Sequence, residues 1–347
     1  MAHQNDIAVA MHTPPPEAQL MQLAAGAFLS QAIYVAAKLG IADLLADRAK
    51  TVQYLAAKTE TDERSLYRVL RSLASVGAFS ESDGKTFSNT PMTETLSSSH
   101  PNSTRDLTIW LHEPEHWNVY AGLMHSVKTG KPAWDEILGE PVFPYLFKTN
   151  TQLGDIFNRA MTSFSHQSIG PILEAYDFSH AEVIADIAGG YGHLLAAVLA
   201  ANPNAKGVLF DMKEVLAGAP KMLDSYKVSD RVELVEGEFF SAVPVKADIY
   251  LLKHVIHDWY DDNNEKTLRN IGASMPNDAK VLIIDAIVPE GNKPHFSKII
   301  DLEMLMTPGG VERTEVEFAE LLKRSGFRLN RVVPTKGPIS IVEALKS

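Results

Sequence analysis

The twelve residues Ile184-Ala-Asp-Ile-Ala-Gly-Gly-Tyr-Gly-His-Leu-Leu195 decide the fold of this chain. They begin as an apolar strand, pass through glycines and continue into a stretch rich in leucine and alanine that is typical of a helix. Glycines between a strand and a helix let the backbone turn tightly and approach a nucleotide or nucleoside. By itself this pattern is a weak signal, because such turns are common. It makes Asp186 and the loop Ala188–Gly192 the first candidates for a ligand-binding site.

Short runs of valine, isoleucine and leucine alternate with helical stretches through the second half of the chain. This alternation predicts a doubly wound α/β domain, in which helices join parallel strands. The turn Lys336-Gly-Pro338 before the last strand indicates an antiparallel edge hairpin. The expected strands are Val183–Ile187, Gly207–Phe210, Val232–Val235, Ile249–Leu252, Val281–Ala286, Arg328–Val333 and Ile339–Ala344. The expected helices are Leu194–Ala201, Val215–Ser225, Asn264–Met275 and Glu315–Ser325.

The first hundred residues predict several helices followed by a hairpin, which is a winged-helix pattern. Asp83-Gly84 favours a tight turn between two short strands, Ala78–Ser80 and Thr86–Ser88. We divide the chain into a winged-helix-like domain at 1–100, a helical linker with pocket helices at 101–180 and the α/β domain at 181–347. The expected helices are Leu20–Leu39, Ile41–Leu45, Val52–Lys58 after a Thr51 cap, and Glu63–Val76 after an Asp62 cap.

Aromatic side chains and methionines are dense between residues 101 and 180. Burial in a helical core accounts for most such residues. The alternative is that some of them line an apolar pocket for a flat ligand. The residues concerned are Trp110, Trp117, Trp134, Phe143, Tyr145, Phe157, Met161 and Phe164.

Composition limits the functions open to the chain. Its 347 residues can form two domains, and 45% apolar with 22% charged residues is ordinary for a globular protein. The absence of cysteine excludes disulfides, cysteine-ligated metals and a cysteine nucleophile. A net charge of −11 disfavours nucleic acid as a partner. We see no signal peptide or membrane span, only a polar tail at 1–19, and expect a cytoplasmic protein.

Acidic residues follow the next two strands. Asp211 ends the strand after the glycine loop, where a carboxylate can accept hydrogen bonds from both ribose hydroxyls. A dinucleotide enzyme has the same feature, and capping of the helix from Met212 onward is an alternative. In Gly237-Glu-Phe-Phe240, Glu238 could accept the amino group of adenine while the Phe239 ring packs on the base. The alternative there is a loop with two core phenylalanines.

The stretch Lys253-His-Val-Ile-His-Asp-Trp259 is the most informative one. It follows a buried strand, so its polar side chains lie at the carboxyl edge of the sheet, where α/β proteins bind ligands. His257 can act as a base near neutral pH. A metal site is the alternative, because His254 and His257 are three residues apart, but no other histidine or cysteine cluster lies nearby in the sequence and we expect no metal.

Taken together, these motifs resemble the class I S-adenosylmethionine-dependent O-methyltransferases of the caffeate and hydroxyindole type, which include plant phenolic and bacterial secondary-metabolite enzymes. The most specific matches are Gly237-Glu-Phe-Phe240, His257-Asp-Trp259 and Pro308-Gly-Gly-Val-Glu-Arg-Thr314. The resemblance covers nearly the whole chain. It implies an α/β, Rossmann-like methyltransferase sheet with an N-terminal all-helical winged-helix dimerisation domain, S-adenosyl-L-methionine as cofactor, and a homodimer.

The resemblance also implies roles for single residues. His257 falls on the position of the catalytic base, and Asp285 and Glu312 fall on two acids that flank it. The implied substrate residues are Phe157, Met161, Phe164, Asp258 and Met304. The implied cofactor-binding residues are Asp186, Ala188, Gly189, Gly190, Gly192, Asp211, Met212, Glu238, Phe239 and Lys253.

Some of these positions depart from the family or have ordinary alternatives. Ala188 replaces a usual glycine, Glu238 replaces a commoner aspartate, and Asp285 stands where plant relatives have glutamate. Glu312 could instead favour the dipole of a following helix. Asp285 could be a solvated turn residue, and Asp258 could cap the next helix.

The implied reaction is methyl transfer to a hydroxyl of a small aromatic acceptor. A phenol has a pKa near 10, so a positioned base helps it to react as phenolate. We expect His257 to take that proton while an acid holds its tautomer. An N- or C-methyltransferase of the same fold stays open.

Two rival functions come from other classes. A winged-helix DNA-binding regulator is one, but residues 1–100 carry eight lysines and arginines against ten acidic residues, and DNA readers show a basic footprint. We therefore expect no nucleic acid and no membrane as partners. A nicotinamide-dependent oxidoreductase is the other, because the glycine loop and Asp211 permit it, but it leaves His257 and Glu312 without a role.

Overall fold

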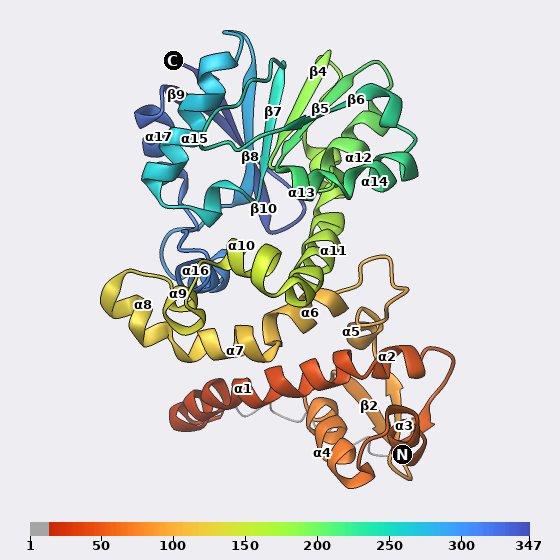
Figure 1. The fold of residues 1–347 in the computed structure, drawn as a ribbon. Coiled ribbons are helices and arrows are strands. Elements are labelled where there is room, and N and C mark those ends of the chain that lie inside the picture. The colour runs from red at the N-terminus through yellow and green to blue at the C-terminus, as the bar shows by residue number, and fades with distance from the viewer. Residues whose placement is uncertain (1–13) are drawn as a thin grey trace, which may run out of the picture. The chain divides into compact units, whose positions relative to one another are not determined.

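The computed structural model describes residues 14–347, so most of the polar tail predicted at 1–19 lies outside the described residues. The chain separates into two compact units, one ending at His112 and one running over Glu113–Ser347 (Figure 1). The three-part division drawn from the sequence stays a prediction.

The first unit combines helices with a small sheet. Strands β1 (Lys50–Thr51), β3 (Thr86–Asn89) and β2 (Phe79–Ser82) pair antiparallel in that order, and β2 and β3 form the predicted hairpin. This unit is therefore not all-helical, as the resemblance implied. It contains the two strands of the predicted hairpin, and β1 adds a third strand that was not predicted. The helices are α1 (Pro16–Lys38), α2 (Ile41–Leu44), α3 (Val52–Thr59), α4 (Glu63–Ala74), α5 (Pro91–Glu94) and α6 (Arg105–His112).

Local sequence signals explain these elements. Thr51 Oγ1 accepts from the backbone N–H of Tyr54 and Asp62 Oδ1 from that of Ser65, which confirms both predicted caps. Apolar residues of α3, α4 and the hairpin meet in one core, with Leu55, Leu70, Phe79 and Phe87 fully buried.

Helix α1 exposes much of its apolar surface. Leu20, Met21, Leu23 and Phe28 are each at least 66% exposed. Among the described helices, α1 alone is long and apolar enough to cross a membrane by length and composition. A helix that packs against another polypeptide meets the same two criteria.

The second unit is built on a seven-stranded sheet in the order β6-β5-β4-β7-β8-β10-β9. The first five strands in this order are parallel, and β10 is antiparallel to both β8 and β9. All seven predicted strands and the edge hairpin are confirmed. Their bounds are β4 Val183–Ile187, β5 Lys206–Asp211, β6 Val232–Glu236, β7 Ile249–Lys253, β8 Lys280–Ala286, β9 Phe327–Pro334 and β10 Ile339–Lys346.

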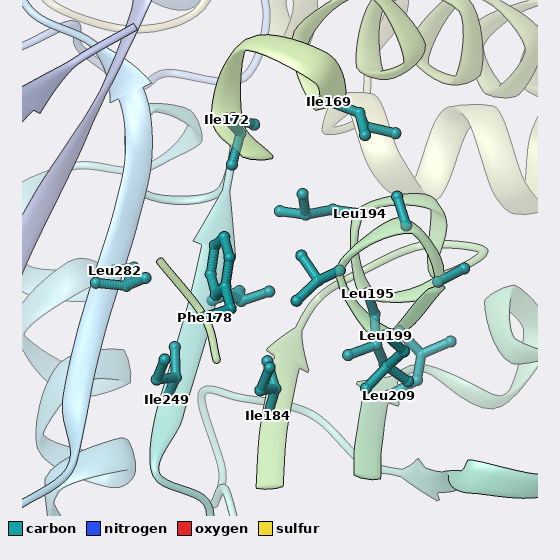
Figure 2. Packing of buried hydrophobic residues seen from close by; sticks show 14 of the residues in the cluster. Ile169, Ile172, Phe178, Ile184, Leu194, Leu195, Leu199, Leu209, Ile249 and Leu282 are labelled. Atoms are coloured by element: carbon teal, nitrogen blue, oxygen red, sulfur yellow. The ribbon is translucent and has the colours of Figure 1, made fainter. Parts of the chain in front are cut away.

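Alternate residues of each strand feed two cores, one on each face of the sheet. Figure 2 shows the first, where Ile184, Leu209 and Ile249 meet leucines of α12 (His193–Ala201) and isoleucines of α11 (Thr151–Ala175). The second core joins the opposite face to α15 (Asp261–Ser274) and α17 (Glu315–Arg324).

One predicted helix is wrong and one helix was not predicted. Val215–Ser225 is two helices, α13 (Lys213–Leu216) and α14 (Ala219–Ser225). Pro220 lacks a backbone N–H and fits only the first turn of a helix, so it starts a new one. Helix α16 (Ser297–Met306) was not predicted. Its N-terminus has no side-chain cap, so a capping signal that would mark its start is missing.

Helices also fill the segment before the sheet. They are α7 (Pro114–Ala121), α8 (Leu123–Thr129), α9 (Ala133–Leu138), α10 (Val142–Pro144) and the π-helical turn η1 (Tyr145–Thr149), which leads into α11. Gly154 of α11 passes so close to η1 that a Cβ atom there would lie 2.2 Å from the carbonyl oxygen of Leu146.

Candidate active site

The glycine loop leaves β4 and enters α12 through three left-handed residues, Ala188, Gly190 and Gly192, with φ of 55°, 63° and 80°. Ala188 thus adopts a conformation that suits glycine better, and its N–H is held by Phe210 O at 2.8 Å. At Gly189 a Cβ atom would lie 2.5 Å from Cγ of Asp186. The loop therefore needs glycine at 189, and its backbone is fixed tightly against the end of β4.

Asp211 ties this loop to β5. Its Oδ2 accepts from the N–H of Gly190 at 2.8 Å and its Oδ1 from that of Met212 at 2.7 Å. Burial raises the pKa of Asp211 to about 6, although these two hydrogen bonds oppose the rise. Each oxygen keeps a lone pair for a further donor, such as a ribose hydroxyl. The alternative that Asp211 caps the following helix is wrong, because Met212 is the N-cap of α13.

Asp186 is the next-to-last residue of β4, and Lys253 is the last residue of the neighbouring strand β7. Burial raises the pKa of Asp186 to about 7, and the positive charge of Lys253 opposes that rise. Burial also lowers the pKa of Lys253 to about 8, opposed by the carboxylates of Asp186 and Asp285. These opposite charges therefore stabilise each other at the carboxyl edge of the sheet.

The Gly237–Phe240 stretch follows β6 at the same edge. Glu238 is exposed, and Ser241 Oγ donates to its Oε2 at 3.3 Å. The Phe239 and Phe240 rings are 4.4 Å apart, and Phe240 meets Trp259 edge-on at 4.8 Å. Both phenylalanines are half-buried, and Phe239 packs against the core on one face of the sheet, so the alternative of core phenylalanines holds in part.

His257 and Glu312 form the centre of the site. They are 55 residues apart, yet His257 Nδ1 lies 2.7 Å from Glu312 Oε1, and both side chains are almost fully buried. His257 lies on the one-turn 3₁₀ helix η3 (Ile256–Asp258) just after β7. A Cβ atom at Gly310 would lie 1.8 Å from the carbonyl oxygen of His257, so glycine there lets the Glu312 segment reach the histidine. Glu312 contacts the imidazole, and Thr314 provides the cap of α17.

Asp285 lies beside this pair without hydrogen-bonding to it. Register places Lys253 opposite Ile284, so Asp285 neighbours His254. Its Oδ1 accepts from the backbone N–H of His254 at 3.0 Å. Of the two acids, one of which was expected to hold the His257 ring, Glu312 is the one that contacts its Nδ1, while Nε2 faces Asp258 Oδ1 at 3.5 Å.

The ordinary alternatives for these acids also fail. Asp285 is fully buried at the end of β8, which excludes a solvated turn. Asp258 faces His257, and the N-cap of the following helix α15 is Tyr260.

Negative charge surrounds His257. Burial alone lowers the pKa of its imidazole, but Asp285, Asp258 and Glu312 together outweigh burial and raise that pKa to about 10. Burial raises the pKa of Asp285 to about 7 and of Asp258 to about 6. The imidazolium form of His257 is therefore favoured at neutral pH, and these four groups titrate as one coupled set.

Aromatic rings connect this centre to α11. Phe157, Met161 and Phe164 follow the i, i+4, i+7 spacing of one helix face. Phe164 lies 5.0 Å from the ring of His254, and Phe157 lies 6.4 Å from Phe143. Phe143 in turn lies 5.7 Å from Trp259. Two of the three predicted α11 side chains thus touch or approach the site, and Met161 is half-buried between them.

The remaining substrate candidate is Met304, whose backbone carbonyl forms the hydrogen bonds seen here. Its side chain is buried in α16, and its carbonyl oxygen accepts from the N–H groups of Gly309 and Gly310 at 2.9 and 3.0 Å. Met304 thus supports the segment that carries Glu312.

Sequence reasoning missed two residues that support η3 and the Glu312 segment. Arg313 is buried, and its guanidinium donates at 3.1 Å to Ile256 O, in the first residue of η3, and to Trp259 O, just after η3. Asp301 Oδ1 accepts from the backbone N–H of Glu312 at 2.8 Å. Arg313 stands inside a motif that the sequence singled out. Asp301 lies on the unpredicted helix α16, so no signal pointed to it.

Known proteins share both the domains and the fold of this chain. An O-methyltransferase domain model matches residues 120–328, and an O-methyltransferase dimerisation domain model matches residues 21–99. The phenazine O-methyltransferase PhzM of Lysobacter antibioticus is 42% identical over 95% of this chain and 96% of its own length.

Solved structures agree with these matches. The crystal structure of LaPhzM has a TM-score of 0.90 at 41% identity, covering 96% of this chain and 100% of that one. CalO1, a methyltransferase in calicheamicin biosynthesis solved with SAH bound, has a TM-score of 0.85 at 34% identity over 95% of this chain and 98% of its own. The family uses S-adenosylmethionine, which excludes the oxidoreductase alternative. The chain therefore belongs to the two-domain family of S-adenosylmethionine-dependent O-methyltransferases.

Proposed function

We propose that this chain methylates a hydroxyl of a small aromatic acceptor of secondary metabolism, with His257 as general base. The observation that carries the proposal is the buried His257–Glu312 hydrogen bond at the carboxyl edge of the sheet. Relatives named as a phenazine O-methyltransferase and a 3-amino-4-hydroxybenzoate 4-O-methyltransferase support an aromatic acceptor.

The residues around the glycine loop fit S-adenosylmethionine. The loop at Gly189 is too tight for a side chain, and both oxygens of Asp211 keep lone pairs, as a bound nucleoside requires. The bound sulfonium supplies an electrophilic methyl group. We assign cofactor binding to Asp186, Ala188, Gly189, Gly190, Gly192, Asp211, Met212, Glu238, Phe239 and Lys253.

His257 takes the acceptor proton in this proposal. Its Nδ1–H donates to Glu312, which fixes the tautomer and leaves Nε2 to receive the proton of the acceptor hydroxyl. Asp258 and Asp285 stabilise the imidazolium that results. A cation bound nearby lowers the pKa of His257 and so shifts the imidazole toward its neutral base form.

The first test replaces the base. His257→Ala should lose about 10² to 10⁴ in turnover of a phenolic acceptor, the usual contribution of a general base. Calorimetric affinity for S-adenosylmethionine should stay within about threefold of the wild type, because His257 is not among the assigned cofactor residues. Unchanged methyl transfer by the variant would exclude His257 as the base.

Nitrogen is the second acceptor atom to consider. A relative from Streptomyces davaonensis that is 36% identical is named as an N,N-dimethyltransferase of 8-amino-8-demethylriboflavin. An aromatic amine attacks as a neutral nucleophile and needs no proton removed beforehand. The buried His257–Glu312 pair therefore favours a hydroxyl, and faster transfer to aniline than to phenol would favour nitrogen instead.

We also propose that the chain is a homodimer through its N-terminal unit, in the cytoplasm, with no nucleic-acid or membrane partner. The matched dimerisation domain and the exposed apolar side chains of α1 support self-association. Burial of that surface in a second copy would remove it from water.

A further inference from the structure

His254 is a polar side chain at the centre that the proposed mechanism does not use. Its backbone has φ of 55°, an unfavourable left-handed conformation for a residue with a Cβ atom. The N–H of His254 donates to Asp285 Oδ1 at 3.0 Å and to Ile284 O at 3.2 Å, which holds this conformation. Such strain is concentrated at functional sites.

The His254 ring lies between α11 and the hydrogen-bonded pair of His257 and Glu312. Its centroid is 5.0 Å from that of Phe164 and 5.2 Å from that of His257, with interplanar angles of 32° and 30°. The side chain is only 14% exposed. The three rings thus form a loose stack that ends at the proposed base.

The nitrogens of His254 are left without hydrogen bonds. Within residues 14–347 neither ring nitrogen has a hydrogen-bond partner, and Nδ1 lies 3.5 Å from Asp285 Oδ1. Burial, together with the nearby charges of Lys253 and His257, lowers the pKa of His254 well below its usual value, so the ring is neutral. A neutral imidazole offers one donor and one acceptor. Burying it without partners is costly, and a bound ligand would remove that cost.

Distance limits which ligand fits both histidines. One nitrogen of His254, one of His257 and one oxygen of Asp285 lie within 4.8 Å of one another. Two nitrogens this close can each form a hydrogen bond of about 2.8 Å to one of two neighbouring polar atoms of a ligand.

We propose that His254 determines acceptor specificity by hydrogen-bonding a second polar atom, on the ring carbon next to the one that bears the methylated oxygen. This inference rests on the proposed function and names its substrate class: aromatic acceptors with adjacent polar substituents. His254 is then a specificity residue, and His257 remains the base.

The test compares catechol, resorcinol and phenol as acceptors, with labelled S-adenosylmethionine. The wild type should favour catechol over the other two by at least tenfold in kcat/KM. Only catechol has two adjacent oxygens, one to hydrogen-bond His257 and one to hydrogen-bond His254. His254→Phe keeps a ring against Phe164 and removes both nitrogens, so the preference should fall to within about threefold of unity. His254→Gly removes the nitrogens without backbone strain at φ of 55°, and should give the same ratio if the Phe variant does not fold.

The outcomes separate this inference from the proposed function. A wild type that methylates phenols without preferring catechol contradicts the inference alone, whereas a wild type that does not bind S-adenosylmethionine contradicts both. An equal loss for all three acceptors in both variants would show a merely structural role. A catechol preference that EDTA abolishes and Zn²⁺ restores would mean that His254, His257 and Asp285 hold a metal ion, and would also overturn the inference.

Discussion

His257 owes its character to the charges that surround it. An imidazole buried among apolar groups would be neutral at pH 7, but three carboxylates raise the pKa of His257 to about 10. Among residues 14–347 only Glu312 hydrogen-bonds to the ring, so in the proposed mechanism Glu312 selects the nitrogen that stays free for the acceptor. Asp258 and Asp285 act through their charge.

Replacing the hydrogen-bonded acid should separate these effects. Glu312→Gln removes one negative charge and the tautomer lock, so we expect turnover to fall about 10² to 10⁴. Because Glu312 raises the pKa of His257, that pKa should move down, and the midpoint of the pH–rate profile should shift to lower pH. Glu315→Gln, an exposed acid three residues on, is the control and should leave profile and turnover unchanged. If the pH–rate profile of Glu312→Gln kept the wild-type midpoint, the claim that the charge of Glu312 raises the pKa of His257 would be contradicted.

At the scale of elements, the site depends on how loops leave strand ends. The strands were predictable because buried runs of valine, isoleucine and leucine between turns have few other interpretations. Helix α16 was not predictable from its sequence, and the position of Asp301 could not be predicted without it. The hydrogen bond from Asp285 to His254 could not be predicted either, because it depends on the register of β7 with β8 and on the left-handed backbone of His254.

The sequence therefore predicted only in part which acids contact His257. The resemblance selected Glu312 from its motif, and the structure brings Glu312 into hydrogen-bond contact with His257. It also selected Asp285, which the structure brings near the histidine without a hydrogen bond to it.

The contact between η3 and the Glu312 segment should tolerate no side chain at Gly310. Gly310→Ala would place a Cβ atom 1.8 Å from His257 O, so the segment must shift. We expect a loss of about 1–3 kcal/mol in the free energy of unfolding, the usual cost of overpacking, and reduced turnover. Chemical denaturation measures the first quantity.

Gly272→Ala is the matched control for this prediction. Gly272 lies within α15, and a Cβ atom there would meet the Phe327 ring at ordinary contact distances of 3.4 and 3.5 Å. Alanine should stabilise that helix by up to about 1 kcal/mol. Equal effects of the two substitutions would contradict the close approach at Gly310.

At the scale of the whole molecule, the two units carry different tasks. The sheet unit holds every residue to which we assign catalysis or cofactor binding. The N-terminal unit holds the matched dimerisation domain and the exposed apolar face of α1. A chain with net charge −11 resists non-specific association, so self-association needs an apolar surface of this kind.

Charge on the apolar face of α1 should prevent dimer formation. We expect the double variant Leu23→Glu, Phe28→Glu to have half the wild-type mass in light scattering, because buried carboxylates would oppose association. Val316→Glu adds charge at an exposed apolar residue of the other unit and should leave the mass unchanged. A monomeric wild type, or a double variant that stays dimeric, would contradict dimerisation through this face.

The most direct measurement of the central claim is the ratio of wild-type to His257→Ala single-turnover rates across phenols of increasing acidity at one pH. If His257 removes the acceptor proton, the ratio should be about 10² to 10⁴ for phenols that are neutral at that pH. It should approach unity for phenols that are already ionised, because they have no proton to lose. A ratio that stays the same across the series would contradict a base role for His257.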